Sequence, residues 1–164
     1  MTRRPQRGFS SKKSCLKTET LGLTSGSQVH NGVMKVAFDF DDTISCSNNT
    51  PNPLGIFHFH NHVMEGHEII IVTSRHESEA SKDAIHGFLR RNGLRVSQVI
   101  HTNGDLKVET LVKQEVSIHH DDDKRELEAL QGTGIQGVNC FNKELFTKLW
   151  IEEFGQEPDE GFDD

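Results

Sequence analysis

Three aspartates and a threonine directly after a short apolar run are the residues of this sequence best placed to do chemistry. The run begins near Met34, and Asp39, Asp41, Asp42 and Thr43 lie at its end. Two carboxylates about 4 Å apart repel by ~1–4 kcal/mol, so a cluster of them either raises its pKa values or holds a cation. A site of oxygen ligands suits Mg²⁺, which also accepts substrate phosphate. The stretch therefore predicts a buried strand with a cation-dependent site at its tip.

Two further predicted strands, residues 68–73 and 116–120, also end in polar side chains. The residues at their ends are Thr73, Ser74 and Arg75 in one case and Asp121, Asp122 and Asp123 in the other. In open α/β sheets, ligands bind beyond the carboxyl ends of the strands. We therefore expect the three strand ends to lie at one edge of a sheet and to form one site.

Strand and helix patterns alternate five times along the chain. The remaining strands are expected at 34–38, 96–100 and 135–141. The expected helices are 54–65, one burying Ala80, Ala84, Ile85, Phe88 and Leu89, 107–114 burying Val108, Leu111 and Val112, one containing Leu127 and Leu130, and one capped by Asn142 and burying Leu145, Phe146, Leu149 and Trp150. Such alternation predicts an α/β fold with a central parallel five-stranded sheet, whose strands are joined by right-handed crossovers.

Three histidines, His58, His60 and His62, recur at a spacing of two residues. On a strand they would share one face and suggest a metal site. On a helix they would spread around the axis and would not converge. The length of the segment and the following Gly66 favour the helix, and hence no metal site there.

The sequence resembles the haloacid-dehalogenase superfamily, in particular small phage and bacterial phosphatases and polynucleotide-phosphatase domains. Four motifs match in the family's order, each at the expected end of its element. The matching residues are Asp39, Asp41 and Thr43 for the first motif, Thr73 for the second, Lys107 for the third, and Asp121 and Asp122 for the fourth. The resemblance implies a three-layer Rossmann-like fold, and a Mg²⁺-dependent phosphatase that acts through an aspartyl-phosphate.

The resemblance also implies a role for each residue. Asp39 would be the nucleophile, and Asp41 would protonate the leaving oxygen and then activate water. Thr73 and Lys107 would complete the catalytic set by binding and neutralising the phosphoryl oxygens. Substrate would be bound by Thr73, Ser74, Arg75 and Lys107, and the metal by Asp39, Asp121, Asp122 and the backbone carbonyl of Asp41.

Several of these assignments have competitors. Arg75 either contacts substrate or forms a salt bridge with a neighbouring acid. Lys113 competes with Lys107 for the third motif, but it falls near the end of its helix. Acids also favour helix N-termini, so the run 121–123 leaves the fourth motif uncertain by one residue. His119 and His120 point to opposite faces of a strand, so at most one of them faces the site, and Asp42 is assigned a turn role.

The spacing between motifs leaves no room for a cap domain beyond a small flap around residues 45–53. An uncapped site suits a large substrate such as a nucleic-acid end or a phosphoprotein. Alternatively, a partner subunit closes the site, so an oligomer is possible. A sugar phosphatase and a non-catalytic binding module of the same fold are the alternatives. Dehalogenation is a weaker rival, because it does not need the acid at Asp41. A fused kinase is excluded, because no G-x-x-x-x-G-K-[ST] motif occurs.

Composition limits the setting of the protein. The 164 residues suit one domain, which we place at 34–154. The three cysteines lack C-x-x-C spacing, which argues against a disulfide framework or a zinc site and for a reducing, cytoplasmic compartment. The longest apolar run, residues 69–72, is too short to span a bilayer.

Charge is distributed unevenly along the chain. Residues 1–33 carry six basic and one acidic residue and have the composition of a disordered segment. One alternative is a transit peptide. Another is that Met34 is the natural start and that residues 1–33 are an extension. Residues 34–164 carry 12 basic and 24 acidic residues, and 155–164 form an acidic tail. So acidic a domain repels polyanions at long range, which argues against generic nucleic-acid coating but permits a local basic pocket.

Overall fold

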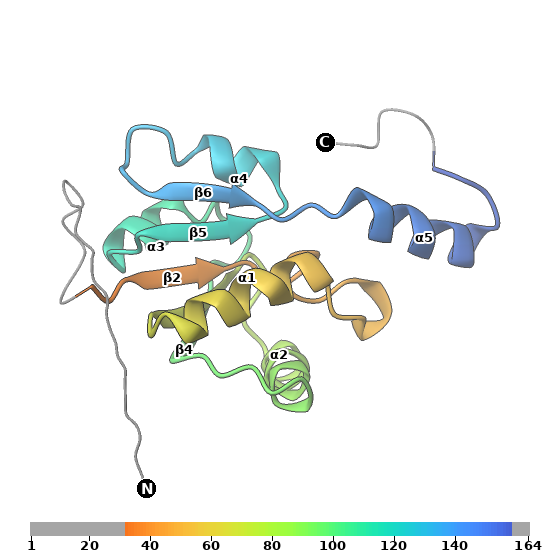
Figure 1. Ribbon diagram of the computed structural model, residues 1–164, viewed down its shortest axis with the longest axis horizontal. Helices are drawn as coiled ribbons and strands as arrows, with labels where there is room; N and C mark the ends of the chain where they lie inside the picture. Colours follow the sequence, from red (N-terminus) through yellow and green to blue (C-terminus); the bar gives the residue numbers. More distant parts are fainter. Residues whose placement is uncertain (1–31, 159–164) are drawn as a thin grey trace, which may run out of the picture.

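A central sheet of five parallel strands organises the molecule. The computed structural model describes residues 32–158, and within them the strands lie in the order β4-β3-β2-β5-β6 (Figure 1). The strands are β2 (Lys35–Phe38), β3 (Glu68–Thr73), β4 (Gln98–His101), β5 (Ile118–Asp121) and β6 (Gln136–Asn139). Every neighbouring pair is parallel. The predicted α/β class, with a five-stranded parallel sheet, is confirmed.

Helices cover both faces of this sheet. On one face lie α1 (Pro53–Met64) and α2 (Glu79–Arg91), and on the other lie α3 (Val108–Lys113) and α4 (Lys124–Glu128). Two further helices, η3 (Ser47–Asn49) and α5 (Lys143–Phe154), lie outside these two layers (Figure 1). Successive side chains of a strand point to opposite faces. Accordingly, Phe38 of β2 is buried with Phe59 of α1 and Phe88 of α2, whereas Ala37 is buried with Leu111 of α3. The result is a three-layer arrangement with a separate apolar core on each side of the sheet.

The strand register places two acids side by side at one edge of the sheet. Phe38 is level with Ile71 of β3 and with His120 of β5. The backbone N–H of Asp39 donates to the carbonyl of His120 at 2.9 Å, which continues the ladder by one residue. Asp39 and Asp121 each follow that last pair, so they lie level on adjacent strands.

The segment between β2 and α1 forms the predicted small flap. An isolated antiparallel bridge joins Ser45 to Pro51, and η3 forms the tip between them. The beginning of α1 lies so close to this segment that a Cβ on Gly55 would collide with the carbonyl oxygen of Thr43. Within residues 32–158 the connections between the strands hold no inserted cap domain.

Some side chains that the helix patterns assigned to the core lie at the surface. Ile85, Phe88 and Leu89 of α2 are buried as predicted. Ala80 and Ala84 of the same helix are exposed, as is Val112 of α3, which is 51% exposed. A helix buries only the stripe that faces its sheet, and these three residues lie outside that stripe.

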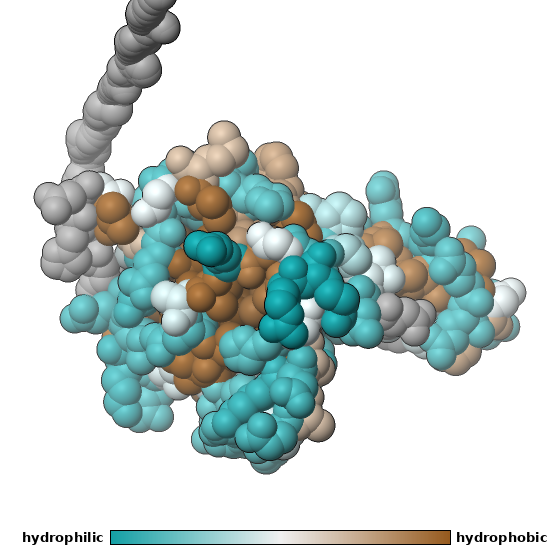
Figure 2. Space-filling model, turned by 90° about the horizontal axis from the view of Figure 1, so that it is seen from below, coloured by the Kyte–Doolittle hydropathy of each residue, from teal (hydrophilic) through white to brown (hydrophobic). Residues whose placement is uncertain are grey.

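Helix α5 departs most from its prediction. Asn142 caps it as expected, because its side chain accepts a hydrogen bond from the backbone N–H of Leu145 at 3.1 Å. The helix projects away from the sheet, however, and none of its side chains is fully buried (Figure 1). Its rings pack on one another instead, with 4.5 Å between the ring centroids of Trp150 and Phe154. Apolar side chains therefore show on the projecting helix in Figure 2.

The three histidines of α1 also correct the sequence-based interpretation in part. The helix is confirmed, and His60 is exposed. The prediction that the histidines do not converge is wrong for His58 and His62, whose rings lie 4.9 and 5.0 Å from that of His120. Residues four apart on a helix are neighbours on one face, which accounts for the convergence.

Two predictions concern parts of the chain that the structure does not describe. The basic extension lies outside the described residues up to residue 31, as does the acidic tail from residue 159. None of the helices between residues 32 and 158 combines the length and apolar character that crossing a membrane requires.

Candidate active site

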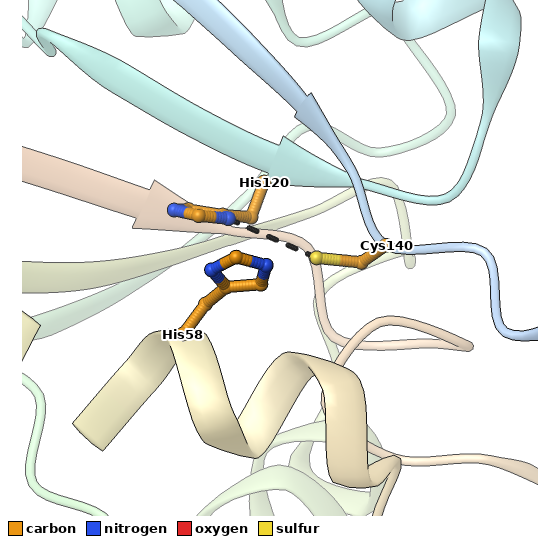
Figure 3. Close-up of side chains that lie close together, drawn as sticks. All are labelled: His58, His120 and Cys140. Atoms are coloured by element: carbon orange, nitrogen blue, oxygen red, sulfur yellow. Dashed lines mark hydrogen bonds between the residues drawn. The ribbon is translucent and has the colours of Figure 1, made fainter. Parts of the chain in front are cut away.

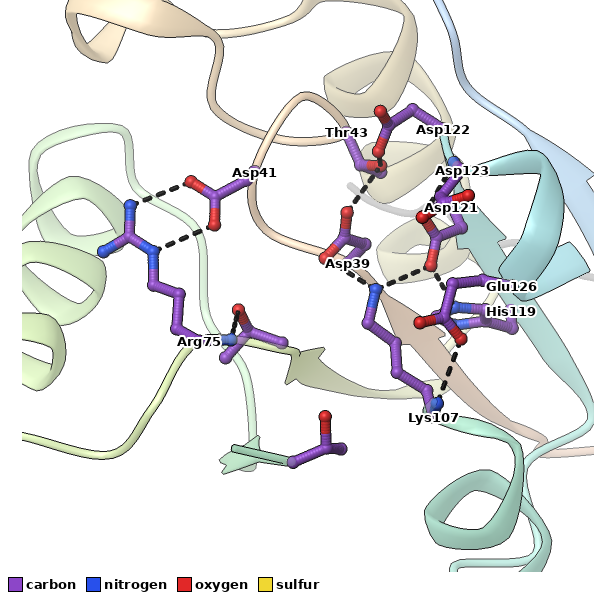
Figure 4. A network of polar contacts seen from close by, with 12 residues as sticks. Asp39, Asp41, Thr43, Arg75, Lys107, His119, Asp121, Asp122, Asp123 and Glu126 are labelled. Carbon is purple, nitrogen blue, oxygen red and sulfur yellow. Dashed lines mark hydrogen bonds and ion pairs between the residues drawn. The ribbon is translucent and has the colours of Figure 1, made fainter. Parts of the chain in front are cut away.

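A buried lysine joins two buried acids at the carboxyl edge of the sheet. The ammonium group of Lys107 lies 2.8 Å from Oδ1 of Asp39 and 2.7 Å from Oδ2 of Asp121 (Figure 4). Lys107 is the residue before α3, and its own backbone N–H donates to Glu126 at 3.0 Å. The helix start thus aims the long side chain along the α3 face of the sheet toward the strand tips.

The turn after β2 adds a hydroxyl group that contacts acids at the ends of both β2 and β5. Thr43 is fully buried, and its Oγ1 lies 3.5 Å from Oδ2 of Asp39 and 3.2 Å from Oδ1 of Asp122. The turn is tight because the carbonyl of Phe40 accepts hydrogen bonds from the N–H groups of residues 43–45. Asp42 takes the left-handed backbone conformation that such a turn needs, with φ of 66°.

Asp121 is held by several donors at once. Besides Lys107, Nε2 of His119 lies 2.8 Å from its Oδ2, and the backbone N–H of Asp123 donates to its Oδ1 at 3.0 Å. Burial raises the pKa of Asp121, but the hydrogen bond from His119 and the charge of Lys107 outweigh it and lower the pKa to about 2. Asp121 is therefore ionised at neutral pH.

Asp39 and Asp122 carry less compensation. Burial and the charge of Asp121 raise the pKa of Asp39 well above its ordinary value, although Lys107 acts in the opposite direction. Burial, together with the charge of Asp121, raises the pKa of Asp122 to about 6. Burial lowers the pKa of Lys107, but the charges of Asp39 and Asp121 reverse this effect and raise it overall. The cluster thus holds three carboxyl groups and one ammonium, which contacts Asp39 and Asp121 only.

This donor set fits a hard divalent cation. One oxygen from each of Asp39, Asp121 and Asp122 lies within 4.8 Å of the others, so a single ion can contact all three. The raised pKa values of Asp39 and Asp122 are those of carboxylates that a nearby positive charge would keep ionised. Oxygen ligands are those that Mg²⁺ and Ca²⁺ prefer. The fourth predicted ligand, the backbone carbonyl of Asp41, stays a prediction.

The side chain of Asp41 does not join the buried cluster. It makes a bidentate ion pair with Arg75, with Nε and a terminal nitrogen of the guanidinium 2.9 and 2.8 Å from its oxygens. The guanidinium carbon also lies 5.3 Å from the centre of the Phe40 ring. The hydrogen bond to Asp41 raises the pKa of Arg75. Of the two interpretations of Arg75, the salt bridge is the one present in the structure.

Thr73, the residue of the second motif, and the following Ser74 lie at the carboxyl end of β3. Thr73 is the last residue of β3, and it is buried with its Oγ1 accepting a hydrogen bond from the N–H of Arg75 at 3.2 Å. The hydroxyl proton of Thr73 is thereby left to donate elsewhere. Ser74 is exposed at the same strand end. Their predicted contacts with substrate stay predictions.

The structure also distinguishes between the competing residues of the sequence. Lys113 is exposed on α3, whereas Lys107 is buried among acids. Asp123 caps α4 by accepting a hydrogen bond from the N–H of Arg125 at 2.9 Å, so the acid run divides into two cluster residues and one helix cap.

Sequence reasoning missed two buried partners, Glu126 and His119. Glu126 fixes the backbone of Lys107, and no sequence signal separated it from the other acids near α4. His119 was left undecided between two faces. The alternation along β5 puts it on the same face as Asp121, and this rule could have identified it.

A cavity of about 210 Å³ opens beside the acid cluster. Its polar side includes Asp42 and Asp122, and its apolar side is made by Phe141, Phe146 and Leu149 at the start of α5. The projecting helix therefore supplies an aromatic wall next to the strand tips.

We expect replacement of Asp122 by Asn to stabilise the metal-free protein at neutral pH more than in acid. With a pKa of about 6 against an ordinary 3.8, the folded protein keeps a proton that the unfolded chain releases between those values. Stability due to this group therefore falls as pH rises through that window, and the variant escapes a loss of about 1–3 kcal/mol near pH 7.

Denaturant unfolding in EDTA, near pH 4 and near pH 7, checks this expectation. Asp83→Asn, an exposed change on α2, is the control and should show no such pH-dependent gain. An equal difference between wild type and Asp122→Asn at both pH values would contradict the shifted pKa.

Comparison with known proteins identifies the fold but no family. No protein-family model and no curated protein matches the chain. Among solved structures, a chain of a Pnkp1/Rnl/Hen1 complex matches with a TM-score of 0.56 and 17% identity, over 73% of this chain and 51% of its own length. A chain of a Pnkp1/Rnl/Hen1 RNA repair complex matches with a TM-score of 0.56 and 14% identity, over 72% and 47%. This chain therefore spans about half the length of the chains that it matches.

Proposed function

We propose that the protein is a Mg²⁺-dependent phosphomonoester hydrolase of the haloacid-dehalogenase type that acts on a nucleotide or a nucleic-acid end. The observation that carries the proposal is the buried contact of one lysine with two strand-tip acids. The ammonium group of Lys107 lies 2.8 Å from Asp39 and 2.7 Å from Asp121. One carboxylate oxygen of Asp122 lies within 4.8 Å of one oxygen of each of these two acids. A nucleophilic carboxylate, a cation site and a fixed positive charge are the parts that phosphoryl transfer requires.

Asp39 of the cluster and the neighbouring Asp41 divide the reaction between them. A carboxylate oxygen of Asp39 attacks phosphorus, and the bond from phosphorus to the ester oxygen breaks. Asp41 donates a proton to that oxygen as it leaves. Asp41 then takes a proton from the water that attacks the aspartyl-phosphate, which releases inorganic phosphate and restores Asp39. Bound Mg²⁺ would supply the positive charge that lets an anionic carboxylate approach an anionic phosphate.

Lys107 and Thr73 bind the transferred group in this scheme. Lys107 neutralises charge on the phosphoryl oxygens while it also holds Asp39 in place. Thr73 has a hydroxyl proton left to donate, because its oxygen already accepts from the N–H of Arg75. Both groups are fixed before substrate arrives, which keeps the cost of ordering them low.

Arg75 links substrate binding to the freedom of Asp41. In the structure its guanidinium engages both oxygens of Asp41. A substrate phosphate offers the same bidentate partner with more charge, so it competes for Arg75. Transfer of Arg75 from Asp41 to the phosphate would release the carboxyl group for proton transfer. This exchange unites the two interpretations of Arg75.

Two features support a nucleotide or nucleic-acid end as substrate. The site has no cap domain over it among the described residues, so a large substrate can reach it. The cavity beside Asp122 is walled by Phe141 and Phe146, and aromatic rings next to a phosphate site suit a stacked base. The fold is also that of chains in an RNA repair complex, which adds weight to the same substrate class.

A panel of phosphorylated compounds tests the activity. We expect release of inorganic phosphate from 3′-phosphorylated oligonucleotides or nucleotides in Mg²⁺, and no release in excess EDTA. Sugar phosphates and phosphopeptides in the same panel separate the alternative substrates. Turnover that persists in EDTA would contradict the metal-dependent scheme. Inactivity across the whole panel would favour a non-catalytic module.

We expect Phe146→Ala to weaken binding of nucleic-acid substrates selectively. Base stacking on an aromatic ring contributes ~1–3 kcal/mol, so KM for an oligonucleotide should rise about 5–150-fold. Hydrolysis of p-nitrophenyl phosphate, which has no base, should hardly change. Phe154→Ala is the matched control, because Phe154 is an exposed ring on the same helix outside the cavity. Equal effects of Phe146→Ala on both substrates would contradict base stacking.

A further inference from the structure

A second cluster of metal-ligating side chains lies on the other face of the sheet. It consists of His58 from α1, His120 from β5 and Cys140, the residue after β6 (Figure 3). Side chains alternate along β5, so His120 points toward α1 while Asp121 points toward α3. The ring of His120 stacks on Phe38 at 4.3 Å, which holds it on the α1 side. This cluster is therefore separate from the acid cluster.

The one donor distance known within the cluster matches that of two ligands of a tetrahedral metal ion. One donor atom from each of the three residues lies within 4.8 Å of the others. Nδ1 of His120 lies 3.7 Å from Sγ of Cys140. Two ligands of a tetrahedral Zn²⁺, one sulfur and one nitrogen, lie about 3.6 Å apart when the usual bond lengths are applied. A metal ion therefore fits between these atoms with little movement of either side chain.

A neighbouring histidine orients His120 as a ligand. Nε2 of His120 lies 2.9 Å from Nε2 of His62, so one of the two nitrogens carries the shared proton. If Nδ1 of His120 binds a metal, its Nε2 carries a proton and donates to His62. Nδ1 of His62 then carries a proton, and Oε1 of Glu65 lies 3.6 Å from it, too far for a hydrogen bond. An acceptor for the second ring N–H, here Nε2 of His62, is the usual way in which a protein orients a histidine ligand.

The donor types select the metal. A thiol with two imidazoles suits Zn²⁺ or another late first-row ion, whereas Mg²⁺ and Ca²⁺ prefer oxygen. His120 and Cys140 are buried to 1% and 0% exposure, while His58 is half-buried. Burial raises the pKa of Cys140 to about 12, so the thiol carries its proton when no metal is bound. A bound metal ion displaces this proton, because a thiol that coordinates a metal is deprotonated.

We propose that His58, His120 and Cys140 bind a zinc ion that joins α1, β5 and the segment leading to α5. Cys140 directly precedes that segment, and its carbonyl already accepts a hydrogen bond from Asn52 at 3.1 Å. The ion would add a side-chain link at the same place and so anchor the base of the projecting helix. The proposal is independent of the phosphatase activity, because it involves other residues and another kind of metal.

Cobalt substitution tests the site in the full chain. Co²⁺ is added in excess Mg²⁺, which fills oxygen-ligand sites, and the near-ultraviolet absorption of a thiolate bound to cobalt is recorded. We expect this band to saturate at one equivalent and to disappear when Zn²⁺ displaces the cobalt. Zinc content after gel filtration provides a second measurement.

Four variants locate the metal. Cys140→Ser should abolish the thiolate band, and His58→Asn should weaken cobalt binding at least about tenfold, since even losing a residue that supports a ligand costs that much. Cys46→Ser and His60→Asn are the controls and should leave the band unchanged, because both residues lie outside the cluster.

Two outcomes would overturn the proposal. One is folded wild-type protein that binds no zinc and shows no thiolate band. The other is a band that survives Cys140→Ser. If Cys140→Ser does not fold, the half-buried His58 decides, and unchanged cobalt binding in His58→Asn would refute the site.

Discussion

Asp39→Asn should abolish turnover on every phosphorylated substrate. The change keeps the shape of the side chain but removes the nucleophilic charge and one predicted metal ligand. Because Asp39 forms the covalent intermediate in the proposed scheme, a better leaving group cannot rescue the variant. We expect hydrolysis of both p-nitrophenyl phosphate and oligonucleotide phosphates to fall to the uncatalysed background, measured as phosphate release at saturating Mg²⁺.

The fold should tolerate this substitution. Asp39 is buried and its pKa is raised, so a neutral amide removes a charge that burial disfavours. Circular dichroism and thermal unfolding should therefore show a folded variant, and loss of activity is then not due to unfolding. Near wild-type rates on any substrate would mean that the aspartyl-phosphate mechanism is wrong for this protein.

Asp41→Asn should reduce kcat by about 10²–10⁴-fold on substrates with poor leaving groups, which is the usual contribution of general acid–base catalysis. The loss should shrink with p-nitrophenyl phosphate, because p-nitrophenolate leaves without a proton. It should not vanish, since hydrolysis of the intermediate still lacks its base. Metal affinity should be retained, because only the backbone carbonyl of Asp41 is a predicted ligand. Steady-state rates on a series of leaving groups measure this dependence.

Arg75→Ala is the control for the broken ion pair. Asp41→Asn also removes one partner of a bidentate contact, with distances of 2.8 and 2.9 Å. If that loss alone explained the effect, Arg75→Ala would lower kcat equally and with the same dependence on leaving group. We expect it instead to raise KM, because Arg75 then no longer binds phosphate, and to leave the leaving-group dependence of kcat as in wild type.

The sequence by itself determined the sheet and the residues at its edge. Strand patterns that run into acids at Asp39 and Asp121, alternating with helices, predicted parallel strands, and the structure has them in a single parallel sheet. The signal is clearest for β2 and β3, because strands buried on both faces form apolar runs whose polar ends are conspicuous. It is weaker for β5, which contains His119 and His120. The helix pattern predicted a helix over 107–114 that Lys107 opens, and the structure has Lys107 as the residue before α3. The chemical roles of these residues remain proposals.

Tertiary structure decided which polar groups face one another. The choice of Asp41 as the partner of Arg75 joins residues 34 positions apart, and several acids were equally available in sequence. Helix α5 has an apolar pattern that predicted burial, but it packs against neither face of the sheet, and Phe146 and Leu149 line a cavity instead. A hydrophobic pattern predicts that one face of a helix is buried, but it does not identify the residues against which that face packs.

The histidine and cysteine cluster shows the same limit most clearly. Cys140 has no second cysteine at metal-binding spacing, and His58 and His120 lie 62 positions apart, so no local motif exists. Only the packing of α1 against the sheet, next to the strand that ends before Cys140, brings the three donors within 4.8 Å. Local patterns arise from the repeat of one helix or strand, whereas a site built from three elements depends on how they pack.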